Sequence, residues 1–445
     1  MAVEPGSDAS TVPKHIHEFR DPIHTFIHVS SEERDIIDSR PVQRLRHIHQ
    51  LALTFMVYPG ATHRRFEHSL GVMELASRIF DTVTDREHLH SDAVKGLAEL
   101  TDTAKLPYWR AVVRLAALCH DIGHLPFSHA AEDRLPKGWN HERLSRELLR
   151  SEELSGLLGS ITPPVRVEDV VKLAVGAKGY GEPLSMWEAI LAEIITGDAL
   201  GSDRIDYLLR DAHHTGVAYG RFDHYRLIEC MRILPKPGTD LAEFTLGIEV
   251  GGLQSAESLL LARYLMYSQV YFHAVRRAYD CHLNDFLERW LPDGRFSTDL
   301  ERHLSVTDDE ILSAIAECAR NDSHAAHVHA ARIFSRKHFK LLRDVGSAGK
   351  DFLDAGENVY AAVCERYGAD AVRRDRYFQR ESVVDFPVLD RDGSTVSSLQ
   401  LSSLLTRLPT VKFDYVFIDP EHLDDARIWL KAHEASIMGQ SVENS

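Results

Sequence analysis

Cysteine is scarce in this chain of 445 residues, and its five cysteines are scattered. No two of them form a C-x-x-C pair, and their number is odd, so the sequence indicates neither a disulfide framework nor a zinc knuckle. They stand at Cys119, Cys230, Cys281, Cys318 and Cys364. Such cysteine usage is typical of a protein from a reducing compartment.

Long apolar runs and an excess of positive charge are also missing. No stretch approaches the ~18 apolar residues that a membrane span needs. The chain has 67 acidic and 51 basic residues, a formal net charge of −16, which argues against a basic surface for duplex nucleic acid. We therefore expect a soluble cytoplasmic protein with no membrane partner, whose ligands are small anions accompanied by a metal ion.

The apolar residues that are present recur mostly at helical spacing, so the predicted fold class is mainly α. Helices are expected over 31–53 with a break at Pro41, over 66–83, 108–122, 186–196 and 203–214, and as one long helix over 257–291. Near the C-terminus, segments 382–390, 399–408, 412–418 and 424–433 alternate strand and helix, which predicts a small α+β module. The predicted organisation is a flexible tail over 1–14, a helical core over 15–310, and a helical and α+β region over 311–445.

The stretch Leu115–His129, LAALCHDIGHLPFSH, holds the densest group of chemically active side chains. His120 and Asp121 close the helix predicted over 108–122, and Gly123 is expected to stop it. An imidazole and a carboxylate together suit Mn, Fe, Co, Ni or Zn. Two adjacent residues of a helix point about 100° apart, so further ligands must come from neighbouring helices. A histidine at a helix end is also a common cap, so the pair alone leaves both interpretations open.

Two further residues complete a pattern. His68 lies in the first turn of the helix over 66–83, and Asp203 opens the helix over 203–214. The order H…HD…D on three helices resembles the HD-domain phosphohydrolases. The stretches PVQRLRHIHQL with VYPGATHRRFEHSLGV, LCHDIGHLPFSH, and SDRIDYLLRDAHHTG look like the SAM-and-HD-domain deoxynucleoside triphosphate triphosphohydrolases and their bacterial relatives. The similarity extends over roughly residues 15–290, so it covers most of the predicted core.

The resemblance implies an HD-domain phosphohydrolase core that cleaves deoxynucleoside triphosphates (dNTPs) to deoxynucleoside and triphosphate. It implies that one divalent transition metal (Mn, Fe, Ni, Co or Zn) is held by His68, His120, Asp121 and Asp203, with Mg as a companion of the nucleotide. Bound water there would have a lowered pKa.

The resemblance also assigns the residues that handle the phosphates. His129 would be the leading acid or phosphate-activating residue, His124 would contact the same phosphoryl group, and His141 would act as a relay. Glu142 and Glu132 would orient these histidines, although the family has Asp where Glu132 stands. Arg65 and Arg204 would grip phosphates, with Arg204 replacing the family's usual Lys.

A further set would hold the sugar: Gln50, Leu51, Tyr207, Asp211 and Tyr279. In this set Gln50 and Asp211 would bind the 3′-hydroxyl, and Tyr279 would crowd a 2′-hydroxyl, which favours deoxyribose. The family has an Arg eight residues before Tyr279, where this chain has Tyr271, so the expected grip on the nucleotide is changed.

A possible activator site is implied by Asp38, Gln43 and Arg46, which match guanine-reading positions of the family, while His17 stands for the family's preceding Lys. By the same resemblance the chain would form a homodimer or homotetramer, with a nucleotide as activator. Two alternatives stay open: another HD hydrolase that acts on nucleoside monophosphates, cyclic nucleotides or (p)ppGpp, or a catalytically silent nucleotide sensor.

Overall fold

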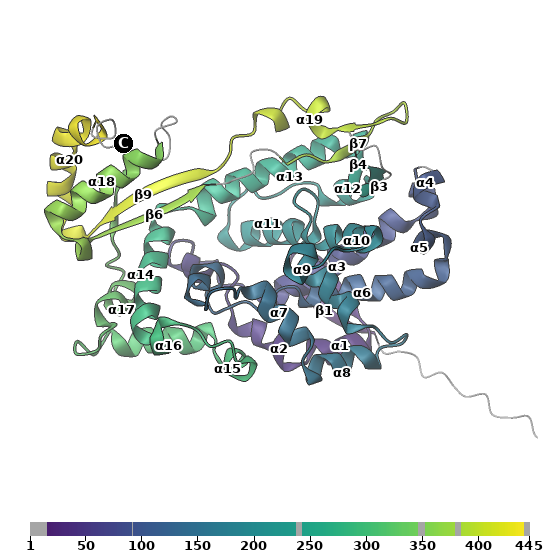
Figure 1. Cartoon of the computed structure of the whole chain (residues 1–445), viewed down its shortest axis with the longest axis horizontal. Helices are drawn as coiled ribbons and strands as arrows, with labels where there is room; N and C mark the ends of the chain where they lie inside the picture. The colour runs from purple at the N-terminus through teal and green to yellow at the C-terminus, as the bar shows by residue number, and fades with distance from the viewer. Residues whose placement is uncertain (1–15, 91, 237–242, 346–351, 379–383, 440–445) are drawn as a thin grey trace, which may run out of the picture.

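The computed structural model describes residues 16–90, 92–236, 243–345, 352–378 and 384–439. The tail predicted over 1–14 lies outside these residues. Figure 1 shows a broad helical body, a smaller sheet with two helices at the upper left, and long strands that connect the two. The prediction of a mainly α fold is confirmed.

The helices of the body follow one another closely. They are α1 (Ser31–Ile37), α2 (Arg40–Arg44), α3 (Arg65–Thr84), α4 (Asp92–Lys95), α5 (Ala98–Thr101), α6 (Leu106–Cys119), α7 (His141–Leu149), α8 (Glu152–Ser160), α9 (Val167–Tyr180), α10 (Met186–Thr196), α11 (Ser202–Thr215) and α12 (His224–Glu229). Helix α3 is buried along most of its length and packs against α6 and α11, while α9 and α10 cover α6. The centre of the core is therefore where α3, α6 and α11 meet.

Local signals account for several helix ends. Pro41 is the second residue of α2, Asn140 caps α7 by accepting the Arg143 N–H at 2.9 Å, and α11 ends at Gly216 with a positive φ of 78°. Gly123 does not stop α6 through a left-handed turn. Instead, a Cβ at Gly123 would lie 2.8 Å from Ser145 Oγ, because the chain after α6 passes tightly against α7.

The prediction of one long helix over 257–291 is wrong. The chain forms α13 (Leu253–Met266), a π-helical segment η8 (Tyr267–Tyr271) and α14 (Ala274–Trp290). The Phe272 N–H bonds to the Tyr267 carbonyl at 3.0 Å, which widens the turn. The apolar pattern runs through this break because α13 and α14 each bury an apolar face.

Three small sheets accompany the helices. β1 (His17–Asp21) and β2 (Thr25–Val29) form a hairpin that covers α3. The second sheet has the order β3 (Met231–Pro235), β4 (Phe244–Glu249), β7 (Pro387–Leu389), β8 (Thr395–Ser397), in which β4 and β7 are parallel and the other pairs antiparallel. The third has the antiparallel order β5 (Lys340–Asp344), β9 (Lys412–Ile418), β6 (Val372–Phe378).

The predicted C-terminal α+β module is therefore divided. The segment around β7 and β8 returns to the body, whereas β9 joins β5 and β6, and α18 (Phe352–Tyr367) and α20 (Leu423–Gly439) pack on that sheet. The remaining helices are α15 (Leu300–Ser305), α16 (Asp308–Cys318), α17 (His327–Phe334) and α19 (Ser398–Leu401). The boundary placed at residue 310 stays a prediction.

Strand β9 presents a different set of side chains to each of its two faces. Val416 and Ile418 pack with α18 and α20, while Phe413 and Phe417 pack towards η8 and α14. The third sheet is thus fixed between its own helices and the body.

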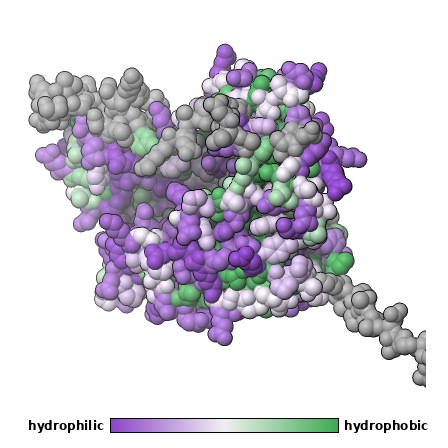
Figure 2. All heavy atoms as spheres, turned by 45° about the vertical axis from the view of Figure 1, so that its right-hand side comes forward, coloured by the Kyte–Doolittle hydropathy of each residue, from purple (hydrophilic) through white to green (hydrophobic). Residues whose placement is uncertain are grey.

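In the described part of the chain, none of the helices is both long and apolar enough to cross a membrane. On the face drawn in Figure 2, hydrophilic side chains cover most of the lower body.

Candidate active site

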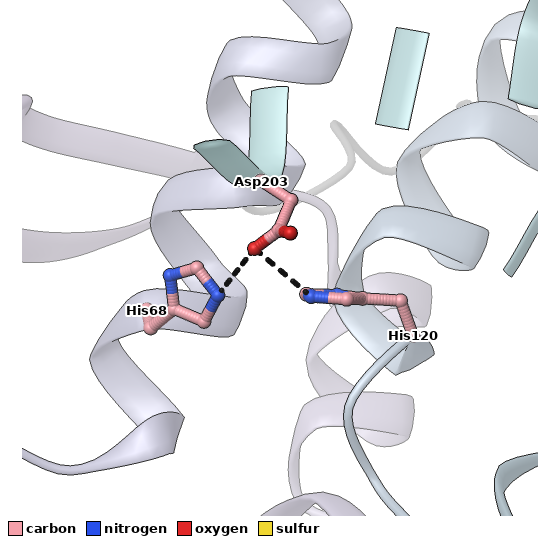
Figure 3. A group of neighbouring side chains, drawn as sticks. All are labelled: His68, His120 and Asp203. Carbon is pink, nitrogen blue, oxygen red and sulfur yellow. Dashed lines mark ion pairs between the residues drawn. The ribbon is translucent and has the colours of Figure 1, made fainter. Parts of the chain in front are cut away.

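Three helices deliver three potential metal ligands to one point. His68 comes from the first turn of α3, His120 follows the last turn of α6, and Asp203 lies in the first turn of α11. Their ligand atoms all lie within 4.8 Å of one another. Asp203 Oδ1 is 3.0 Å from His68 Nε2 and 3.6 Å from His120 Nε2, and Figure 3 shows both rings directing a nitrogen at this carboxylate.

Both imidazoles are oriented by a hydrogen bond on the opposite nitrogen. His68 Nδ1 lies 2.8 Å from Asp206 Oδ2, and His120 Nδ1 lies 2.7 Å from the Ala117 carbonyl oxygen. Each Nδ1 therefore donates its proton, and each Nε2 is directed into the site, where it can ligate a metal ion when it carries no proton. Among the described residues, His120 Nε2 is buried without a hydrogen-bond partner. This orphaned acceptor fits a metal ligand.

The electrostatics also favour a cation. Burial alone lowers the pKa of His68, but the hydrogen bonds to Asp203 and Asp206 outweigh it and raise this pKa to about 10. Burial alone raises the pKa of Asp203, but the nearby rings of His120 and His68 outweigh it and hold this pKa below its usual range. Carboxylates that stabilise a positive charge on the neighbouring imidazole also stabilise a divalent ion, so the residues could hold a divalent metal.

Asp121 lies beside this group. Its Oδ1 is 3.3 Å from His120 Nε2 and its Oδ2 is 3.8 Å from His68 Nε2. Arg65 forms a hydrogen-bonded ion pair with Asp121 and donates from Nε to Ser128 Oγ at 2.8 Å. Arg65 thus lies at the site but is already paired with one of the four predicted ligands.

Behind His68 lies a buried network that the sequence prediction missed. Asp206 accepts from His24 at 2.7 Å and from Arg210 at 2.8 and 2.9 Å, and Arg210 also bonds Asp21 at 2.8 Å. Asp206 and Arg210 are 0% exposed. The signal available in the sequence was the spacing of Asp206 and Arg210 at i+3 and i+7 from Asp203, which puts all three on one side of α11.

Two further histidines extend the site from the candidate metal group, which consists of His68, His120 and Asp203. The rings of His124 and His141 stack with centroids 4.1 Å apart, and His124 Nε2 lies 3.3 Å from Asp121 Oδ1. Burial, together with Arg65 and His141, holds the pKa of His124 well below its usual range, so this ring is neutral. Glu132 accepts from His141 Nδ1 at 2.6 Å, which directs His141 Nε2 away from it.

Of the other predicted catalytic residues, Glu142 lines a cavity together with His124 and His141, and it accepts from Asn140 Nδ2 at 3.2 Å. The backbone of His129 lies in the short helix η5 (Ser128–Ala130), beside the site. Its side chain lies outside the described part of the structure.

A cavity of about 640 Å³ leads away from the metal group. Predicted substrate residues Gln50, Leu51, Tyr207 and Asp211 line it, and so does Tyr271. Asp211 accepts from Tyr271 Oη and from His63 Nε2, each at 2.7 Å. The side-chain carbonyl oxygen of Gln50 is buried, with no partner among the described residues. Tyr271, which stands where the resemblance implies an arginine, is thus a neutral group that bonds Asp211.

Two of the predicted substrate residues do not line this cavity. The Arg204 side chain turns to the Gly197 carbonyl at 2.9 Å and to Asp198 at 3.5 Å. Tyr279 is 0% exposed and packs against His338, with ring centroids 4.7 Å apart. The adjacent turn of α14 presents Arg276 and Arg277 to the cavity instead.

The predicted activator residues lie close together on the surface around α1 and α2. Arg46 donates to Gln43 at 2.9 Å and covers the Phe66 ring at 3.5 Å, while Asp38 lies 3.4 Å from Arg34. Arg34 also bonds the ring of His17 at 3.0 Å. The structure thus brings these positions to one face, where each already has a partner within the chain.

A second group of possible ligands consists of His282, Asp285 and His329. His282 Nε2 accepts the Phe339 N–H at 3.0 Å, so its proton lies on Nδ1, which points at His329 Nδ1 at 3.3 Å. Asp285 is paired with Arg373 at 2.8 Å. The proton on His282 Nδ1 and the guanidinium of Arg373 already take up these positions. The three residues therefore form a packed polar cluster and not a metal site.

The fold and the His–Asp group together define an HD-domain protein. Residues 65–178 match the HD domain family, and residues 222–408 match the HD associated region. The chain belongs to the HD phosphohydrolase family.

Individual relatives agree with this family. The chain is 38% identical over 261 residues to the uncharacterized protein MJ1154 of Methanocaldococcus jannaschii, which covers 59% of this chain and 47% of that protein. It is 33% identical over 238 residues to the deoxynucleoside triphosphate triphosphohydrolase SAMHD1 of Mus musculus, and this match covers 48% of this chain and 34% of that protein. The crystal structure of a hypothetical protein from Aquifex aeolicus matches with a TM-score of 0.76 and 32% identity, covering 94% of this chain and all of that one.

The chain spans about half the length, or less, of the curated relatives it matches. The match to the Aquifex aeolicus structure, by contrast, covers 100% of that chain.

Proposed function

We propose that this protein is a metal-dependent triphosphohydrolase that cleaves dNTPs to deoxynucleoside and triphosphate. The observation that carries the proposal is the continuous cavity of about 640 Å³, which joins the His–Asp group to the polar group around Gln50 and Asp211. Its size lies within the range of small-molecule sites. The similarity to SAMHD1 over 238 residues supports the same substrate class.

His68, His120, Asp121 and Asp203 would hold the metal, for which we propose Mn, Fe, Ni, Co or Zn, with Mg accompanying the nucleotide. When bound, a divalent ion would polarise a phosphoryl oxygen. His124 and His141 would contact the reacting phosphate. His129 would supply the proton to the departing 5′-oxygen, with Glu132 and Glu142 orienting the neighbouring rings.

The sugar would lie against Gln50, Leu51 and Asp211. The free carbonyl oxygen of Gln50 suits a hydroxyl donor, and Asp211 is held in place by His63 and Tyr271. Leu51 is 8% exposed and lines the wall, so a 2′-hydroxyl there would be buried without a partner. Tyr279 would contribute to this exclusion of a 2′-hydroxyl from behind the wall. We expect dNTPs to be preferred over NTPs.

Regulation and assembly are part of the proposal. Asp38, Gln43 and Arg46 would bind an activating nucleotide that promotes a homodimer or homotetramer. The segment from α2 to Gln50 connects this face to the cavity, so a ligand that orders one end would bias the other. His17, in place of a lysine, predicts a weaker hold on the activator's phosphates.

The test is a screen of all four dNTPs and NTPs with metal-loaded protein, in which nucleoside and triphosphate are quantified separately. Each reaction is run with and without GTP or a second dNTP, and on Asp38→Ala, with sizing chromatography in parallel. Equal rates on GTP and dGTP would refute the sugar selection. Cleavage of monophosphates, cyclic nucleotides or (p)ppGpp in place of dNTPs would favour another HD hydrolase, and binding without turnover would favour a silent sensor.

A further inference from the structure

The end of the cavity away from the metal group is built from aromatic side chains. Tyr267, Tyr271 and Phe272 come from η8 and the turn after it, and Tyr377 comes from β6. Asp203 and Asp211 are eight residues apart on α11, a rise of about 12 Å. Since Asp211 contacts Tyr271, the aromatic group adjoins the proposed sugar position.

Tyr377 lies on the edge strand β6 and is held against the body by contacts that involve both β6 and the central strand β9. Its ring centroid lies 4.5 Å from that of Phe272, and Phe413 of β9 lies 4.8 Å from Phe272. Asp375, two residues before Tyr377, forms a two-pronged ion pair with Arg277 at 2.6 and 2.8 Å. The Tyr415 hydroxyl also donates to the Phe272 carbonyl at 3.1 Å. The strand is thus fixed to α14, yet Tyr377 remains 36% exposed.

The two arginines at this end are already paired. Arg277 bonds Asp375 and lies 3.0 Å from Asp280, while Arg276 bonds the Tyr271 carbonyl at 2.6 Å and Asp280 at 3.3 Å. Their guanidinium groups are therefore poorly placed to bind phosphate. What this end offers to a ligand is aromatic surface, which suits a flat, uncharged ring.

We propose that Tyr377 is the stacking platform for the nucleobase of the substrate, so that the C-terminal sheet completes a site whose chemistry lies in the HD domain. The inference rests on the proposed function. With phosphates at the metal group and sugar at Gln50 and Asp211, the base projects to the aromatic end. Because every base has a π-face, stacking on Tyr377 strengthens binding of all four dNTPs without selecting one base.

The experiment compares Tyr377→Ala and Tyr377→Phe with the parent protein in its metal-loaded form. For Tyr377→Ala, KM for each of the four dNTPs should rise roughly ten- to hundred-fold, while kcat stays within a few-fold. Tyr377→Phe should stay close to the parent, since it keeps the ring. Inorganic triphosphate, which has no base, should inhibit all three proteins with the same constant. Tyr225→Ala serves as the matched control, because Tyr225 is an exposed tyrosine on α12 outside this cavity.

An unchanged KM in Tyr377→Ala would overturn the proposal, and so would an equal loss of affinity for dNTPs and for triphosphate. If the parent protein hydrolyses no dNTP, the proposed function fails on its own. Calorimetric binding of dATP and of triphosphate to the same variants then decides the role of Tyr377: a loss confined to dATP supports stacking, and any other pattern refutes it.

Discussion

Gly71 provides a sharp test of the network behind the metal group. A Cβ at this position of α3 would lie 2.7 Å from Asp206 Cγ, whereas carbon atoms pack at about 3.5–4.0 Å. Gly71→Ala must therefore displace the Asp206 carboxylate by about 1 Å. That carboxylate is fully buried and accepts hydrogen bonds from His24, His68 and Arg210.

Breaking a buried ion pair costs about 3–5 kcal/mol, and alanine in a helix gains about 1 kcal/mol over glycine. We expect Gly71→Ala to lower the free energy of unfolding by about 2–4 kcal/mol, and metal affinity by about 10- to 100-fold because His68 loses its orienting partner.

Urea unfolding and elemental analysis of the purified protein measure both effects. Gly156→Ala is the matched control: Gly156 lies in helix α8, where an added Cβ meets open space, so about 0.5–1 kcal/mol of stabilisation is expected. If Gly71→Ala is as stable as Gly156→Ala and keeps its full metal content, the network does not constrain His68 and the reasoning is refuted.

Three further results are expected. His120→Ala and Asp203→Ala should each lose the bound metal, and full occupancy in both, by elemental analysis, would contradict the ligand set. His129→Ala should keep the metal and the fold but lose about 10²–10³-fold in kcat; a rate within a few-fold of the parent would make this residue structural. His282→Gln should flatten the decline of stability below pH 6.5. Burial and the neighbouring His329 lower the pKa of His282 to about 2, so the unfolded chain takes up a proton that the folded chain excludes. Each pH unit below about 6.5 then lowers the free energy of unfolding of the parent protein by up to about 1.4 kcal/mol. The variant lacks this contribution. Urea midpoints at pH 7 and pH 5 measure this, and equal slopes for both proteins would contradict it.

The helical core and the positions of the metal group could be predicted because local signals specify them. His68 and Asp203 each lie in the first turn of a helix whose start the sequence marks, and His120 closes a third helix. Side chains at helix ends point into the space that neighbouring helices share, so three such ends can meet. The orienting network was missed because Asp21 and His24 come from a hairpin far from α11, and a sequence pattern does not register such distant pairs.

The break between α13 and α14 could not be predicted for a related reason. The segment from Tyr267 to Tyr271 contains neither Gly nor Pro, and its aromatic side chains continue the apolar pattern of both helices. What stabilises the wider turn is tertiary: the Tyr271 hydroxyl bonds Asp211, and the Arg276 side chain bonds the Tyr271 carbonyl. Such contacts exist only once α11 and α14 are packed together.

The same break links α11 to the C-terminal sheet beside the cavity. A continuous helix would carry the backbone past the cavity, whereas the π-helical turn exposes Tyr271 to Asp211 on one side and Phe272 to the C-terminal sheet on the other. The proposed metal ligands His68, His120 and Asp121 lie within residues 65–178, and Tyr271 and Tyr377 lie within 222–408. A chain that ended at residue 178 would keep three of the four proposed metal ligands but lose Asp203, together with Asp211, Tyr271 and Tyr377. The cavity therefore depends on both regions, because its lining includes the proposed metal ligands from one and the aromatic side chains Tyr271 and Tyr377 from the other.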